Sequence, residues 1–197
     1  MTIKTIAAAA VLAAVSTNLQ AQTLVNSGTY GGNSYQVYDD PKIDWADAET
    51  FATSHGGFLA VVLNSAQNNY IAGLDPRGEY WLGGYQTPGE LNKTNSWNWV
   101  HGGGTFPGVN GATGFTQSFS DWAPGEPNDD YGPGSEQWLA IGLEGAALWN
   151  DEGNLNNMTG FVVEYSRVPD SGSLIASFGL TFLGLAAAHR RFTAKTA

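Results

Sequence analysis

The amino-acid sequence predicts a single α+β domain between two terminal segments of different character. Two segments with helical periodicity come early, at 44–55 and 65–74, and runs with strand character follow them. A stretch without periodicity, rich in Gly, Pro, Asn and Asp, interrupts the strand region at 101–135. Strands that mostly follow the helices along the chain, rather than alternating with them, are typical of the α+β class.

The first elements are expected to be a hairpin and a helix. Residues 24–38 are rich in Gly, Tyr and Val and predict two short strands around a turn at Gly31-Gly32-Asn33. The helix is expected to start at Asp44, which can cap its first turn, and to stop at Gly56-Gly57. Its inward face is expected to consist of Trp45, Ala48, Phe51 and Ala52.

The second helix is expected to start with Ser65 as its N-cap and to run to about Leu74. Its predicted inward face consists of Ala66, Tyr70, Ile71 and Leu74. Runs that predict strands lie at 58–62, 80–85, 97–100, 136–141, 147–149 and 160–165. Six tryptophans are expected in the core, namely Trp45, Trp81, Trp97, Trp99, Trp122 and Trp149, with a sugar platform as the alternative for Trp122.

Composition excludes some functions and favours others. The net charge is −10, and residues 22–167 hold 17 acidic and four basic residues, a net charge of −13. Because phosphate binding needs a basic face, nucleic acid is excluded as a partner, and cations are expected instead. The alternative for most of these acids is a solvated surface that keeps the protein soluble. The chain has no Cys, which excludes thiol chemistry and thiolate metal sites.

The N-terminal segment, 1–21, is typical of a secretory signal peptide. Lys4 precedes an apolar run at 6–15, and the small residue Ala21 is the expected cleavage position. The run is too short to span a bilayer. A buried N-terminal helix is the alternative.

The C-terminal segment, 168–197, has the order of a sorting signal. An apolar stretch at 174–188 precedes His189-Arg190-Arg191 and is marginal for crossing about 30 Å of hydrocarbon. This order resembles the PEP-CTERM class of bacterial sorting tails, in a VPDSG variant. The motif consists of Val168, Pro169, Asp170, Ser171 and Gly172. The resemblance implies an exosortase-type membrane peptidase as partner and transient membrane association through 174–188; a plain membrane anchor is the alternative.

Six sets of short motifs occur in order between about Tyr35 and Tyr165 and together resemble C-type lectin domains. They are Trp45-x-x-Ala48 with Gly56-Gly57-Phe58-Leu59-Ala60, Tyr80-Trp81-Leu82-Gly83, Trp97-x-Trp99, Phe119-x-x-Trp122-x-Pro124-Gly125-Glu126-Pro127-Asn128, Trp149-Asn150-Asp151 and Gly160-Phe161-Val162-Val163-Glu164. The resemblance implies a C-type-lectin-like fold over 22–167, with two helices packed on short antiparallel sheets and a long calcium-binding loop.

The two disulfides usual in that family have no counterpart here. The resemblance puts Ala52 and Val163 at the positions of one pair, where they are expected to pack as an apolar contact. Trp138 takes one position of the other pair, whose partner falls near Asn154 or Leu155. A lost disulfide costs about 2–4 kcal/mol, so bound calcium is expected to matter more for the long loop.

Five residues implied by the resemblance supply the hard oxygen ligands that calcium prefers. They are Glu126, Asn128, Glu136, Asn150 and Asp151. The same five are expected to bind sugar, because vicinal hydroxyls can replace waters on calcium, donate to carboxylates and accept from amides. A cis bond at Pro127 is a further hypothesis. In the family, Glu-Pro-Asn goes with mannose-, glucose- or fucose-type hydroxyls, so mannose/glucose-type preference is implied.

Several alternatives remain open at this point. Asp129 resembles a ligand of a second calcium in some members, but Asp129 and Asp130 are expected to be solvated loop acids. The domain as a whole is expected to bind carbohydrate or exopolysaccharide outside the cell, with a lectin-like module that contacts protein or surface polymer without sugar selectivity as the alternative. For the five-residue set, the alternative is a calcium-free domain with solvent-facing polar loops. It is not expected to be an enzyme, since no nucleophile, phosphate-loop or His metal motif occurs.

Overall fold

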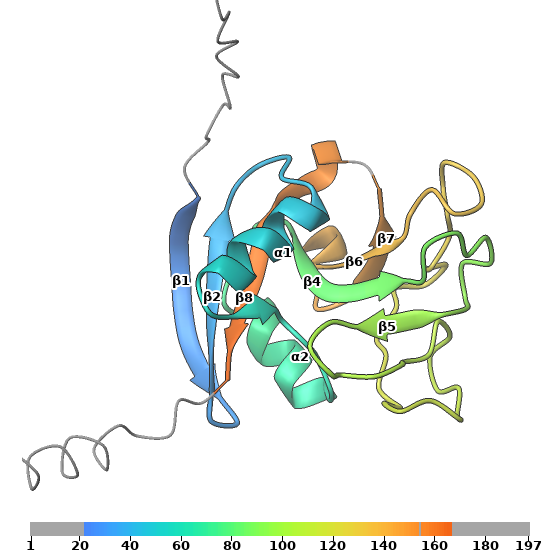
Figure 1. The fold of residues 1–197 in the computed structure, drawn as a ribbon, viewed down its shortest axis with the longest axis horizontal. Coiled ribbons are helices and arrows are strands. Elements are labelled where there is room, and N and C mark those ends of the chain that lie inside the picture. Colours follow the sequence, from blue (N-terminus) through green and yellow to red (C-terminus); the bar gives the residue numbers. More distant parts are fainter. Residues whose placement is uncertain (1–21, 154, 167–197) are drawn as a thin grey trace, which may run out of the picture.

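A mixed sheet of eight strands forms the scaffold of the computed structural model, which describes residues 22–153 and 155–166 (Figure 1). The strand order is β1-β2-β8-β4-β6-β7, with β3 paired to β8 and β5 paired to β4. The strands are β1 (Thr23–Tyr30), β2 (Asn33–Asp39), β3 (Phe58–Leu59), β4 (Glu79–Gln86), β5 (Trp97–Trp99), β6 (Trp138–Ile141), β7 (Trp149–Glu152) and β8 (Met158–Tyr165). The central pair, β4 and β8, is parallel and all other pairs are antiparallel.

Two α-helices accompany the sheet, as the α+β prediction required. They are α1 (Trp45–Ser54) and α2 (Ser65–Ala72), and short 3-10 turns occur at η1 (Leu143–Gly145) and η2 (Leu155–Asn157). In Figure 1 the β1–β2 hairpin lies at one edge of the domain, and the loops between β5 and β6 lie at the other. The predicted signal peptide at 1–21 and sorting tail at 168–197 lie outside the described residues.

The first helix follows its sequence signals. The Asp44 side chain accepts a hydrogen bond from the backbone N–H of Asp47 at 2.7 Å, which confirms it as the N-cap. Ala48 and Ala52 are fully buried, while Gly56 ends the helix with a φ of 81° that favours glycine.

The second helix corrects two predictions. Its N-cap is Asn64 rather than Ser65, because the Asn64 side chain accepts from the backbone N–H of Gln67 at 2.9 Å. The expected inward residue Ala66 is exposed, and Gln67 and Asn68 are buried beside Ile71 instead. The helix also ends at Ala72, two residues before Leu74.

Hydrogen bonds of two buried side-chain amides explain why Gln67 and Asn68, rather than Ala66, face the core. The Gln67 Nε2 group donates to the Tyr35 hydroxyl at 2.9 Å and to the Val61 carbonyl at 2.6 Å. Asn68 accepts from the Trp149 indole N–H at 2.8 Å and donates to the Ala147 carbonyl at 2.6 Å. Buried polar groups are stable when all their hydrogen bonds are made, so these amides fasten α2 to the rest of the core.

One predicted strand is shorter than expected, and another is shifted along the chain. The segment 58–62 is buried, but only Phe58–Leu59 forms a strand, because the Val61 N–H donates to the Glu164 side chain rather than to a neighbouring strand. The strand predicted at 147–149 begins at Trp149 and continues to Glu152.

The core contains five of the six tryptophans expected there, whereas Trp45 is only partly buried. Trp81, Trp97 and Trp149 are completely buried, and Trp122 from the long loop is 3% exposed, which confirms the core assignment for Trp122. Trp122 lies 4.8 Å from Trp97 between ring centroids. The long loop is therefore anchored from inside by its own aromatic side chain. A second cluster on α1, β4 and β8 contains both Ala52 and Val163, so the two positions of the missing disulfide lie in one apolar cluster.

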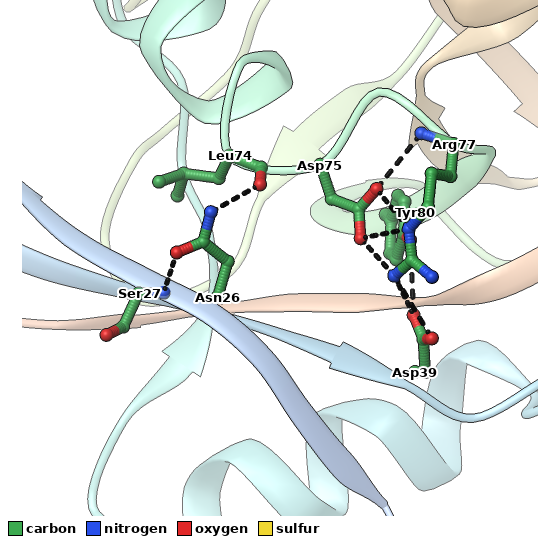
Figure 2. Close-up of polar contacts among 7 residues, drawn as sticks. All are labelled: Asn26, Ser27, Asp39, Leu74, Asp75, Arg77 and Tyr80. Atoms are coloured by element: carbon green, nitrogen blue, oxygen red, sulfur yellow. Dashed lines mark hydrogen bonds and ion pairs between the residues drawn. The ribbon is translucent and has the colours of Figure 1, made fainter.

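A polar network ties the β1–β2 hairpin to the segment between α2 and β4 (Figure 2). The Arg77 guanidinium pairs with the carboxylate of Asp75 and, at 3.2 Å, with that of Asp39 on β2. The Asn26 side chain on β1 donates to the Leu74 carbonyl at 2.7 Å. These contacts hold the segment that leads into β4, whose first residue, Glu79, accepts a hydrogen bond from Asn150.

Candidate metal and sugar site

The site forms where the long loop runs beside the start of β7. Trp122 makes a parallel bridge to Trp149, and the Ala123 N–H donates to the Trp149 carbonyl at 2.9 Å. Because Ala123 and Trp149 are paired, the chain that follows each of them continues in the same region. Glu126, Asn128 and Asp151 are brought together in this way.

Asp151 organises the Glu-Pro-Asn segment. Its carboxylate accepts the backbone N–H groups of Asn128 at 2.8 Å and of Asp129 at 3.0 Å. The Asn128 amide in turn donates to Glu126 Oε1 at 2.9 Å. The bond between Glu126 and Pro127 is cis, as hypothesised.

Two oxygens of this segment have no hydrogen-bond partner among the described residues. They are Glu126 Oε2 and Asn128 Oδ1, and both are shielded from solvent. An unpaired buried acceptor costs about 1–3 kcal/mol, so such atoms usually have a ligand, ion or water. One carboxylate oxygen and one amide oxygen, next to the Asp151 carboxylate, suit a hard cation such as calcium.

The acids of the cluster have raised pKa values. Burial raises the pKa of Glu126 to about 7, helped by the nearby Asp151 carboxyl group and by the charge of Glu136. Burial also raises the pKa of Glu136 to about 7, with the charges of Asp151 and Glu152 acting in the same direction. Burial raises the pKa of Asp151 against the opposing effect of its backbone donors. Placing these carboxylates together therefore costs free energy that a divalent cation would offset.

The loop from Asn128 to Glu136 has its own internal order. The Asp129 carboxylate accepts from the backbone N–H of Gly134 at 2.9 Å and of Glu136 at 3.1 Å. The expectation that Asp129 is solvated is wrong, because its side chain is buried within the loop, where it accepts these two hydrogen bonds. Asp130 is exposed as expected. The Glu136 carboxylate is itself buried and accepts from the Asp130 N–H at 2.7 Å.

Asn150 is differently placed from the other four. In β7 its side chain alternates with that of Asp151, and it donates to Glu79 Oε2 on β4 at 3.2 Å. The structure thus brings Glu126, Asn128 and Asp151 together, with Glu136 near enough for its charge to act on Glu126, and it engages Asn150 with Glu79. Sequence reasoning missed Glu79, because a contact across 71 residues leaves no local signal.

A complete metal site is not formed by charged side chains alone. Within residues 22–153 and 155–166, no three Asp, Glu or His side chains are arranged so that they could hold a metal ion. Two of the predicted ligands are amides, and the carboxyl groups of Glu126, Glu136 and Asp151 do not form such a group by themselves. The full five-residue ligand set therefore stays a prediction.

Comparison with known proteins places this geometry in context. The chain is 25% identical over 135 residues to mouse "C-type lectin domain family 4 member G", a match covering 68% of the chain and 40% of that protein. It is 28% identical over 141 residues to perlucin of Haliotis laevigata, covering 69% of the chain and 79% of perlucin. The chain thus spans about two fifths of the first relative's length. No family model matches it.

Solved structures decide the fold. A Ca²⁺-dependent type II antifreeze protein in its Ca²⁺-free form superposes with a TM-score of 0.55 at 18% identity, over 72% of this chain and 98% of that one. The C-type carbohydrate-recognition domain of cow CD23, determined in the presence of a GlcNAc2Man3 oligosaccharide, superposes with a TM-score of 0.55 at 17% identity, over 75% and 99%. The domain has a C-type-lectin-like fold.

The proteins that this C-type-lectin-like domain resembles are not enzymes. The similar proteins include C-type lectins, perlucins, lithostathine and antifreeze proteins, in agreement with the expectation of a non-enzymatic domain. In the part of the chain that the structure describes, no helix is both long and apolar enough to cross a membrane.

Proposed function

We propose that this domain binds carbohydrate through a calcium ion held by Glu126, Asn128, Glu136 and Asp151, with Asn150 as the fifth ligand. The observation that carries the proposal is the pair of buried, unpartnered oxygens on Glu126 and Asn128. When bound, calcium supplies positive charge and coordination positions for two sugar hydroxyls.

The residues of the chain then select the sugar. Glu126 accepts a hydrogen bond from one hydroxyl, and the Asn128 amide donates to the other. Glu-Pro-Asn in this order favours mannose/glucose-type hydroxyl pairs. The cow CD23 domain, which shares the fold, was determined with a mannose-containing oligosaccharide, and this supports the proposal.

The place of action in this proposal is outside the cell. Residues 1–21 would direct export, and 168–197 would present the domain at the bacterial cell surface or in extracellular polymer after exosortase-type processing. Before processing, the apolar stretch at 174–188 would hold the chain at the membrane.

A second candidate is a lectin-like module that contacts protein or surface polymer without sugar selectivity. The bond between Asn150 and Glu79 favours it, because it engages one of the five proposed ligands elsewhere. A glycan array with the full chain, run with calcium and with chelator, separates the two. Calcium-dependent binding of mannose- or glucose-type glycans is expected. Binding to no glycan under either condition would leave the second candidate.

A further inference from the structure

A hollow of about 450 Å³ adjoins Asn128, between the β4–β5 loop and the loop that follows the Glu-Pro-Asn segment. Its wall on the β4–β5 side consists of Leu91, Asn92 and Lys93, and its other wall consists of Asn128, Asp129 and Pro133. It adjoins a residue of the proposed calcium site, so a sugar held there would have this hollow beside it.

The β4–β5 wall is fixed by its own hydrogen bonds. The Glu90 carboxylate accepts from the backbone N–H of Leu91 at 3.0 Å and of Asn92 at 2.9 Å. The Gln86 side-chain amide on β4 donates to the Asn92 carbonyl at 3.0 Å. The side-chain amide of Gln137, which directly precedes β6, donates to the Glu90 carbonyl at 3.0 Å. The hollow is therefore a preformed surface feature rather than a gap between loose loops.

Lys93 brings positive charge to this hollow. Its Nζ donates to the Asn128 backbone carbonyl at 3.4 Å, and within the described residues no carboxylate lies at ion-pair distance from it. The other basic residues in 22–166 are Lys42, which is not among the residues lining the hollow, and Arg77, which is paired with Asp39 and Asp75. Lys93 is thus the cation that faces the proposed site.

The acid that lines the hollow is not paired with Lys93. Asp129 lines the hollow, but it is buried and both of its oxygens accept backbone N–H groups of Gly134 and Glu136. Leu91 is 67% exposed and gives the same wall an apolar surface. An ammonium beside an apolar surface suits a ligand that carries one negative group on a ring with C–H faces.

We propose that the hollow is a subsite for the carboxylate of a uronic acid, with Lys93 as the residue that selects acidic over neutral sugars. The inference rests on the proposed function, because the sugar hydroxyls must first be held at the calcium site. A uronic acid differs from its parent hexose only at C6, where a carboxylate replaces CH₂OH. Its ring hydroxyls remain available to calcium.

Whether the acidic or the neutral sugar binds more tightly shows whether a positive group lies at the site. Residues 22–166 hold 17 acids and three basic residues, so the domain as a whole repels an anion. Without a local cation, the acidic sugar would bind more weakly than the neutral one. Tighter binding of the acidic sugar therefore requires a positive group at the site.

The test compares dissociation constants of methyl mannoside and the corresponding methyl mannuronoside for the full chain in calcium. We expect the uronate to bind about threefold tighter at low salt, as for an exposed ion pair, and the preference to shrink with added salt. Lys93→Gln should lose the preference while still binding methyl mannoside, and Lys93→Arg should keep it. Lys42→Gln removes the same charge from an exposed site and is the matched control.

Three other outcomes would contradict the inference. Equal or weaker binding of the uronate by the unchanged protein would overturn the inference. So would an equal loss of both sugars in Lys93→Gln, because Lys93 would then only support the Asn128 carbonyl. If calcium-loaded protein binds neither sugar, the proposed function itself fails and the inference fails with it.

Discussion

The carboxylate of Asp151 accepts the backbone N–H of Asn128 at 2.8 Å, across 23 residues of sequence. One side chain on a regular strand thus fixes the backbone of the loop that carries Glu126 and Asn128. Asp151 is 1% exposed, so this bond is shielded from water. Binding of a cation by Asp151 and order in the loop are therefore expected to depend on each other.

Calcium is expected to raise the stability of the protein. Extracellular calcium modules bind at about 10⁻⁴–10⁻³ M, and a 100-fold excess over the dissociation constant adds about 2.7 kcal/mol to the free energy of unfolding. Thermal unfolding with calcium and with chelator measures this difference, and magnesium at the same concentration is the control. Identical midpoints with calcium and chelator would contradict the calcium site.

Asp151→Asn is expected to remove most of the calcium effect and to destabilise the loop without calcium. One carboxylate oxygen is replaced by an NH₂ group that cannot accept the N–H of Asn128 or Asp129, and one lost buried hydrogen bond costs about 1–3 kcal/mol. Asp130→Asn, at an exposed position of the same loop, is the matched control. Equal calcium stabilisation of both variants would show that Asp151 is not a ligand.

In chelator, stability is expected to fall as pH rises from 5 to 8. Glu126 and Glu136 have pKa values of about 7, above their ordinary 4.5. A carboxyl with a raised pKa stabilises the fold fully below the ordinary value, and this contribution is lost as pH rises through the raised value. Unfolding free energies at several pH values test this, and Glu126→Gln with Glu136→Gln should flatten the curve. Calcium should also oppose the loss, because it favours the charged carboxylates.

Local signals in the sequence were enough to predict much of the fold. Asp44 and Gly56 mark the ends of α1 because caps act over a few residues. Five of the six tryptophans expected in the core are buried, and Trp45 is only partly buried. The N-cap of α2 was wrong by one residue, since Asn64 and Ser65 are both good caps and only the backbone conformation chooses between them.

The candidate site could be predicted only in part. The Glu-Pro-Asn and Trp-Asn-Asp segments are visible as motifs, and the structure brings Glu126, Asn128 and Asp151 together. Side chains whose partners lie far away in sequence were missed or misread. Asn68 meets Trp149 across 81 residues and Asn150 meets Glu79 across 71, and neither pairing leaves a periodic pattern.

Ala52→Cys with Val163→Cys is expected to form a disulfide under oxidising conditions. The two side chains belong to one buried cluster, and both are fully buried. Bridging requires Cα atoms about 4.4–6.8 Å apart. Free-thiol counting on the folded protein measures the bond, and Ala48→Cys with Val163→Cys, one turn earlier on α1, is the control. Two persistent free thiols in the first variant would contradict the alignment with the family's disulfide.

Glu126→Gln with Asn128→Asp is expected to shift preference from mannose-type to galactose-type sugars while calcium still binds. The double change keeps the charge of the set, because one carboxylate is lost and another is gained, so calcium affinity should change little. It reverses which side of Pro127 offers the amide donor and which the acceptor. A hydroxyl pair fitted to the original order then loses a hydrogen bond worth about 1–3 kcal/mol, or roughly tenfold in affinity.

Competition between methyl mannoside and methyl galactoside, measured on both proteins in calcium, tests this reversal. Glu136 and Asn150 are unchanged in the double variant, so the shift is expected to be partial rather than complete. Glu144→Gln with Asn69→Asp makes the same chemical exchange at two exposed positions outside the site and should leave the ranking as it was. If the ranking stays the same in the Glu126 and Asn128 variant although calcium still stabilises it, these two residues do not contact the sugar. The module without sugar selectivity would then be the better account of the domain.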